Sequence, residues 1–427
     1  MIRATIISVI DQALLSALNF GLSVLLIHYA SKQEYGLYSQ LINLQPFFSP
    51  LHAGIFVSAF LALAAKMDAR EFSAYQSRIA RVELGASITM CVIVVGIISL
   101  GAKYFGFNIS FMTCLAFGLA LIGLWWREFV RQIQFARMKH VLTLKIDATY
   151  CVVTVALILV VLATSGFNTT AALWCMGIGG VIATALPLFQ AIRHETSESL
   201  SYRQSIAMSW QMGRWEVLGS VLTWGYAQSY VYFAALHGGL DAAAEVAAGR
   251  LLATPLSLMW ASYANVLRPS ASRLLATSSY QETNQLALRS TGFVVGSSVL
   301  YALVVYFLVP IVNQKLFGNK FDHLQSLSMW WIAYVGLTGI TTIASSVLRS
   351  GMQFRQVFTR QLITCAIAVL LLSASLKLPG IHSLVVALIA VEMISAIQCW
   401  RQMHLMLHRS DEFKTEQQYK QLSEHPR

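Results

Sequence analysis

Charge is scarce in this chain, and its scarcity excludes a soluble protein. Of its 427 residues, 11% are charged and 56% are hydrophobic, and the mean hydropathy is +0.61. The apolar sequence comes in blocks of about 17 to 25 residues, the length that crosses a hydrocarbon core, and a soluble domain could not bury so much of it. The sequence therefore predicts an all-α polytopic membrane protein.

The signatures of cofactor and nucleotide chemistry are also missing. The six cysteines show no CxxC spacing and fall within the apolar blocks, where they are expected to pack as small side chains. No GxxxxGK[ST] stretch occurs, so direct use of ATP is not expected. We expect no cofactor, no metal and no catalytic residue. Because the predicted outer loops are short and carry no carboxylate pair, a polysaccharide polymerase or glycosyltransferase is a distant alternative.

The apolar blocks predict twelve spans, and an even number places both termini on one side. Most of the 30 Lys and Arg lie on that side, so the positive-inside rule predicts that both termini are cytoplasmic. These short basic loops explain the net charge of +11, and nucleic acid is not expected as a partner. The predicted spans are 5–28, 36–64, 82–102, 110–126, 147–164, 171–191, 215–236, 243–267, 290–313, 326–348, 361–377 and 383–401.

The order of spans repeats after about 205 to 214 residues, which is typical of transporters built from two similar halves. Each half has six spans and starts on the same side, so the halves are parallel repeats and a central cavity is expected between them. The predicted organisation is an N-terminal six-helix lobe at 1–192, a cytoplasmic connector at 193–214, a C-terminal six-helix lobe at 215–401 and a cytoplasmic tail at 402–427.

Prolines interrupt two of the apolar helices and mark the predicted cavity wall. Pro46 and Pro50 fall in the second span, and Pro255 falls in the eighth. Proline removes a backbone donor and clashes with the preceding turn, and such breaks are tolerated at depth where protein or a water-filled cavity satisfies the freed groups. His52, beside Pro50, is interpreted either as a partner of a freed carbonyl or as a proton carrier or substrate contact.

Ionisable residues inside the spans are the candidate functional residues, because charge in a membrane is costly. Asp11 and Glu392 are candidates for an ion-coupling carboxylate or counter-ion. For Asp11 the alternative is a carboxylate near a helix start, stabilised by free backbone N–H groups or partnered with Gln12 or Asn19. Arg250 is a candidate substrate contact, unless its long side chain reaches the interface.

Two arginines follow the Trp125-Trp126 pair, which we interpret as an interfacial anchor at the end of the fourth span. Arg127 and Arg131 lie about one turn apart on one helix face. They either anchor the helix on the cytoplasmic side or meet an anionic headgroup at the mouth of the cavity.

Short motifs after the spans carry a resemblance to a known family. LRPSASRL at 267–274 and VLRSGMQ at 347–353 follow the eighth and tenth spans, FARMK at 135–139 follows the fourth, and EYG precedes the second. With twelve spans in two halves, this pattern resembles polysaccharide flippases of the multidrug, oligosaccharidyl-lipid and polysaccharide exporter superfamily.

The resemblance implies a bacterial inner-membrane flippase that moves an undecaprenyl-diphosphate-linked oligosaccharide to the periplasmic leaflet for O-antigen, capsule or exopolysaccharide. A polysaccharide polymerase and chain-length machinery are its implied partners. Arg250, with Arg127 and Arg131, is then expected to bind the diphosphate. The alternative is a cation-coupled multidrug extrusion antiporter of the same superfamily, which the carboxylates of Asp11 and Glu392 would suit.

Overall fold

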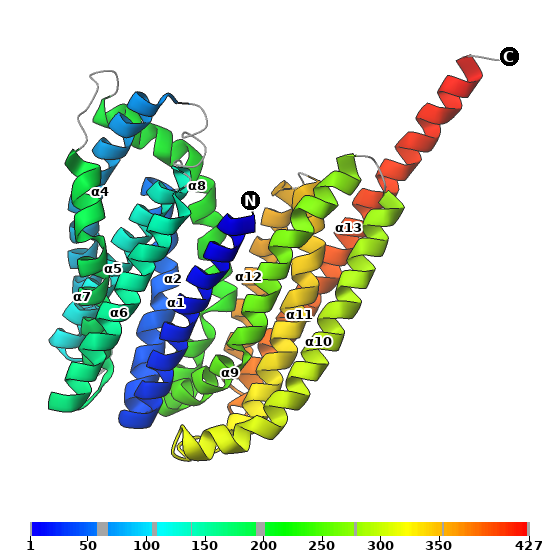
Figure 1. Cartoon of the computed structure of the whole chain (residues 1–427). Helices are drawn as coiled ribbons and strands as arrows, with labels where there is room; N and C mark the ends of the chain where they lie inside the picture. The colour runs from blue at the N-terminus through cyan, green and yellow to red at the C-terminus, as the bar shows by residue number, and fades with distance from the viewer. Residues whose placement is uncertain are drawn as a thin grey trace. The chain divides into compact units, whose positions relative to one another are not determined.

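The computed structural model describes residues 2–57, 67–104, 109–137, 139–193, 201–276, 280–351 and 354–424. These residues form twelve α-helices and no strand (Figure 1), which confirms the predicted all-α fold. The helices are α1 (Ile2–Tyr29), α2 (Lys32–Phe56), α4 (Ala69–Tyr104), α5 (Phe111–Ala136), α6 (His140–Thr164), α7 (Thr169–Arg193), α8 (Tyr202–Ala227), α9 (Tyr230–Ala276), α10 (Tyr280–Lys315), α11 (Leu324–Ser350), α12 (Phe354–Ser375) and α13 (His382–Glu424).

Nine helices in the described part of the chain are long and apolar enough to cross a membrane. They are α1, α4, α5, α6, α7, α10, α11, α12 and α13. The chain is therefore a multi-pass membrane protein. The other three predicted spans correspond to α2, α8 and α9, which carry the polar and interrupted stretches singled out above, and for them a membrane crossing stays a prediction.

The chain divides into two compact units, Met1–Val221 (unit 1) and Leu222–Arg427 (unit 2). The boundary falls within α8, whereas the predicted connector lies at 193–214. Of that connector, the part from Tyr202 onward forms the first turns of α8, and 194–200 lies outside the described residues. The predicted tail from 402 continues α13 as a helix to Glu424.

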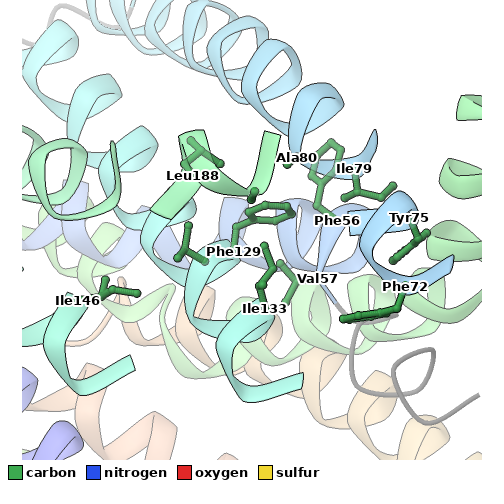
Figure 2. Packing of buried hydrophobic residues seen from close by; sticks show 12 residues of the cluster. Phe56, Val57, Phe72, Tyr75, Ile79, Ala80, Phe129, Ile133, Ile146 and Leu188 are labelled. Carbon is green, nitrogen blue, oxygen red and sulfur yellow. The ribbon is translucent and has the colours of Figure 1, made fainter. Parts of the chain in front are cut away.

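A cluster of large apolar side chains holds unit 1 together near one end of its helices (Figure 2). Phe56 from α2, Tyr75 from α4, Phe129 from α5 and Leu188 from α7 are buried in it. In a membrane protein, close van der Waals packing of such side chains is a main favourable term in holding helices together. The cluster fixes α2, α4 and α5 relative to one another, and these helices carry the polar residues described below.

Glycines allow α5 and α7 to approach closely. A Cβ atom added to Gly180 would lie 2.7 Å from the Cα atom of Gly123, and one added to Gly177 would lie 2.8 Å from the backbone of Leu119 and Ala120. Backbone contact of this kind is typical of helix pairs in membranes, where small residues permit close packing.

The helical backbone continues through all three prolines that were predicted as helix breaks. Pro46 and Pro50 lie inside α2, and Pro255 lies inside α9. The fixed φ of proline suits a helix, so the chain stays helical although the ring removes one donor and crowds the preceding turn. Interruptions occur instead between α8 and α9 at 228–229 and at Gly238-Gly239, where Gly239 has φ 70°, a conformation that favours glycine.

Candidate functional site

A polar pocket of about 270 Å³ lies in unit 1 between α2 and α5. Gln45, Ser49, Pro50 and His52 line it from α2, and Leu124, Trp125, Arg127 and Glu128 line it from α5. Pro50 and Arg127 were candidates from the sequence, and both line this pocket. Pro46 is half-buried one turn earlier in α2, and Pro255 is exposed on α9 of unit 2.

His52 forms a buried pair with a carboxylate that the sequence analysis did not single out. Its Nε2 atom lies 2.7 Å from Oε1 of Glu83 in α4, and the two side chains are 1% and 0% exposed. The imidazole ring stacks on Trp125, with centroids 5.4 Å apart and planes 6° apart. The side chain of His52 thus bonds a carboxylate of another helix. One of the two interpretations from the sequence had expected it to bond a backbone carbonyl freed by Pro50.

Trp125 was expected at the membrane interface, and that expectation is wrong. The side chain is 1% exposed and packs against His52 inside unit 1. Its neighbour Trp126 donates its indole N–H to Ser87 Oγ at 2.8 Å. A tryptophan pair at the end of an apolar block suggests an interfacial anchor, but burial of the block against other helices reverses that interpretation.

Four ionisable side chains from three helices meet beside the pocket. Arg131 of α5 places Nη2 at 3.1 Å from Oδ2 of Asp11 in α1, and Nε at 2.8 Å from Oδ2 of Asp147 in α6. The Nε atom of Arg127 lies 3.6 Å from Oδ1 of Asp147, and its guanidinium covers the ring of Tyr150 at 4.4 Å. Asp11 is therefore held by a guanidinium of another helix, not by its own helix start.

This cluster has more negative than positive groups. Glu128 adds a third carboxylate, with Oε2 at 3.0 Å from Nη1 of Arg131. Two arginines thus face Asp11, Glu128 and Asp147. Because carboxylates neutralise both guanidinium groups at short range, the cluster offers little attraction to an anion and more to a proton or another cation.

Arg250 lies at the interruption between α8 and α9 in unit 2. Its Nη1 atom donates to the carbonyl of Ala227 at 3.0 Å and to Oε1 of Gln228 at 2.9 Å. Ala227 is the last residue of α8, so the guanidinium satisfies one of the carbonyls that a helix end leaves unbonded and stabilises the negative end of the helix dipole. The guanidinium also lies over the rings of Tyr230 and Trp331, at 4.7 and 5.2 Å from their centroids.

Glu392 is buried in α13, and an arginine that was not a candidate from the sequence interacts with it. Arg360 of α12 is 5% exposed, donates from Nη1 to Oγ of Ser395 at 2.5 Å, and interacts electrostatically with Glu392. In the sequence Arg360 lies one residue before the predicted span 361–377, where it was not a candidate. The signal that could have found it is its separation from Asp147, which matches the offset between the two halves.

Known structures share this fold, although no protein-family model and no curated protein matches the sequence. An inward-facing multidrug resistance MATE family transporter of the MOP superfamily superposes with a TM-score of 0.76 at 11% identity, over 93% of this chain and 96% of that one. Lipid II flippase MurJ in an inward closed conformation gives 0.70 at 13% identity, over 96% and 91%. The Vibrio cholerae MATE transporter VcmN in the bent form gives 0.57 at 14% identity, over 96% and 98%.

At sequence identities this low, structural similarity shows a shared fold and does not show a shared function. The fold and the nine apolar helices define the class of protein, a multi-pass membrane protein with the two-lobe helical architecture of exporters and lipid flippases. Both a drug transporter and a lipid flippase have that architecture, so the choice between them depends on the chemistry of the side chains.

Proposed function

We propose that this chain is a flippase that translocates undecaprenyl-diphosphate-linked oligosaccharide units from the cytoplasmic to the periplasmic leaflet by alternating access. The product would enter O-antigen, capsule or exopolysaccharide assembly. The protein would lie in a bacterial inner membrane with both termini in the cytoplasm, beside a polysaccharide polymerase and its chain-length machinery.

The observation that carries the proposal is the presence of arginines within helices of unit 2 that form no ion pair. Arg250 bonds only carbonyl oxygens and aromatic faces, and Arg360 bonds a serine hydroxyl. Neither has a carboxylate within 4.0 Å among the described residues. A guanidinium in a membrane helix is costly, and it binds phosphate through paired hydrogen bonds. An anionic headgroup makes use of these charges, whereas a cationic drug would be repelled by them.

The proposed roles of the other candidates follow from their partners. Among the three arginines predicted from the sequence to bind the diphosphate, Arg250 remains the first candidate, with Nη1 already bonded at the end of α8. Arg127 and Arg131 are weaker candidates, because Asp11, Glu128 and Asp147 neutralise them. Asp11 and Glu392 are the proposed coupling carboxylates for a proton or sodium gradient, since each is buried and interacts with an arginine of another helix.

A specific observation favours the second candidate function, a cation-coupled multidrug antiporter. The pocket in unit 1 lies beside a cluster with more carboxylates than arginines, and it has an aromatic wall at Trp125. Aromatic and acidic surroundings suit an amphipathic cation. A drug-resistance profile of an overexpressing strain separates this function from the flippase.

The test of the proposed function is deletion of the gene in its host, with surface glycan and lipid-linked intermediates measured together. We expect loss of the glycan and accumulation of single lipid-linked units facing the cytoplasm. Wild type should restore the glycan, and Arg250→Ala and Glu392→Gln, expressed to the same level, should not. Normal glycan with altered drug sensitivity would move the protein to the antiporter function.

A further inference from the structure

The ends of α9 and α11 and the start of α12 lie at one end of unit 2 (Figure 1). Near them in the sequence are three arginines, Arg268, Arg349 and Arg360. Ser350, the last residue of α11, donates its hydroxyl to the carbonyl of Arg268 in α9 at 3.1 Å. This bond ties the two helix ends together and brings Arg349 beside Arg268. The charges of both Arg268 and Arg360 act on Arg349. Two of the three arginines belong to the short motifs after the eighth and tenth spans, which are therefore neighbours in space.

Acidic residues are missing from the sequence around this cluster. None occurs between Glu245 and Glu282, or between Asp322 and Glu392. Glu392 is the carboxylate whose charge acts on Arg360, but it forms no ion pair within 4.0 Å with Arg360. Like charges held close together repel one another, so a cluster of this kind gains free energy from a bound anion.

Buried donors without partners lie on α11 and α12, within one turn of the arginines in the sequence. The Nε atom of Arg360 is buried and has no hydrogen-bond partner among the described residues. The same holds for the hydroxyls of Thr364, one turn further along α12, and of Ser346 in α11. Buried polar groups are nearly always bonded, and those that are not commonly mark a bound ligand or water. The donors of Arg360 and Thr364 are spaced as neighbours on one face of α12.

The contrast with unit 1 shows which arginines can accept an anion. There the guanidinium groups of Arg127 and Arg131 bond Asp11 and Asp147 at short distances. A phosphate would have to displace those carboxylates. In unit 2, Arg268 and Arg349 are exposed and no carboxylate of the described residues pairs with either.

We infer that Arg268, Arg349 and Arg360 form a binding site for a phosphate-bearing headgroup, and that its ligand is the diphosphate of the lipid-linked substrate. The identity of the lipid rests on the proposed function, whereas the phosphate chemistry does not. A diphosphate diester carries two negative charges, whereas a phosphatidylglycerol headgroup carries one. Three guanidinium groups therefore match the diphosphate better, and each can form paired hydrogen bonds to phosphate oxygens.

Binding of farnesyl diphosphate to the full-length protein in phosphatidylcholine nanodiscs tests the site. We expect Arg268→Gln and Arg349→Gln each to raise the Kd by about tenfold or more, the effect of losing one charge-assisted hydrogen bond. Both side chains are exposed, so these variants should fold. Arg360→Gln should have a larger effect, and Arg360→Lys, which keeps the charge of this buried position, a smaller one. The matched control is Arg289→Gln, on the exposed face of α10, and it should bind like wild type.

Two further probes separate the sources of the anion. Inorganic pyrophosphate should compete with farnesyl diphosphate, and phosphatidylglycerol added to the nanodiscs should compete weakly. Equal competition by phosphatidylglycerol would overturn the diphosphate assignment and make this a phospholipid site. Equal Kd values for wild type, Arg268→Gln and Arg349→Gln, or an equal loss in Arg289→Gln, would overturn the site.

Failure of the site and failure of the proposed function give different results. If the deletion strain keeps its glycan but Arg349→Gln loses diphosphate binding, the flippase function fails and the site stands. If the protein flips lipid-linked oligosaccharide and Arg268→Gln and Arg349→Gln do so with unchanged apparent affinity, the site fails and the function stands.

Discussion

Replacing Arg131 should destabilise the protein strongly, because this one side chain compensates two buried carboxylates. Its guanidinium lies 3.1 Å from Asp11 and 2.8 Å from Asp147, and the three side chains are 13%, 3% and 0% exposed. Removing one partner of a buried ion pair costs about 3–5 kcal/mol, since the remaining charge loses its partner and cannot regain water. Arg131→Gln should therefore cost about that much. The bond to Glu128 adds little, because that carboxylate is 38% exposed.

Thermal unfolding in detergent, followed by tryptophan fluorescence, measures the effect. If unit 1, Met1–Val221, unfolds as one cooperative unit, a loss of 3–5 kcal/mol should lower its Tm by roughly 6–10 °C. Arg131→Gln combined with Asp147→Asn should recover part of the loss, because the second change removes a charge that the first leaves unpaired. Lys145→Gln, on the exposed face of α6, is the control. A wild-type Tm for Arg131→Gln, or no recovery in the double variant, would refute the buried network.

Three other predictions concern single contacts. His52→Leu should lower stability by about 3 kcal/mol, because Glu83 stays buried without its partner, and Glu83→Gln should cost less; denaturation of the two variants decides. Gly180→Ala should lower the free energy of unfolding by about 1–3 kcal/mol, because the added methyl group forces α7 away from Gly123. An unchanged Tm would contradict this close approach. Arg250→Lys should keep part of the cap on α8 and Arg250→Ala none, so protease cleavage between α8 and α9 should rise in that order; equal cleavage would exclude a capping role.

The helices were largely predictable from hydropathy, whereas the interruptions were not. Long apolar blocks such as 147–164 and 326–348 correspond to α6 and α11 because their length and composition admit little else in a membrane. Proline suggested breaks at three positions, but a helix tolerates it where neighbouring groups satisfy the freed carbonyl. The break at 228–229 has no glycine or proline, and Arg250, more than twenty residues later, bonds to it. Only the tertiary structure reveals that contact.

The candidate residues were predictable as ionisable groups in apolar surroundings, and their partners were not. Asp11 and Arg131 were singled out for different reasons, and the chain separates them by 120 positions, so their contact depends on how α1 packs near α5 and α6. Glu83 and Arg360 were missed because they lie at the ends of predicted spans, where a charge ordinarily faces water. Other helices bury those ends in the folded protein, so Glu83 and Arg360 contact other side chains and not water.

The most direct test of the proposed function is translocation by the purified protein in sealed vesicles. Vesicles containing a polyprenyl-diphosphate-linked oligosaccharide would be treated with a membrane-impermeant glycosidase, which cleaves only outward-facing sugar. The proposal predicts that nearly all of the substrate becomes accessible in vesicles with wild-type protein. In protein-free vesicles about half of the substrate, the part in the inner leaflet, should stay protected. Protection that stays the same with folded wild-type protein under an imposed proton or sodium gradient would contradict it.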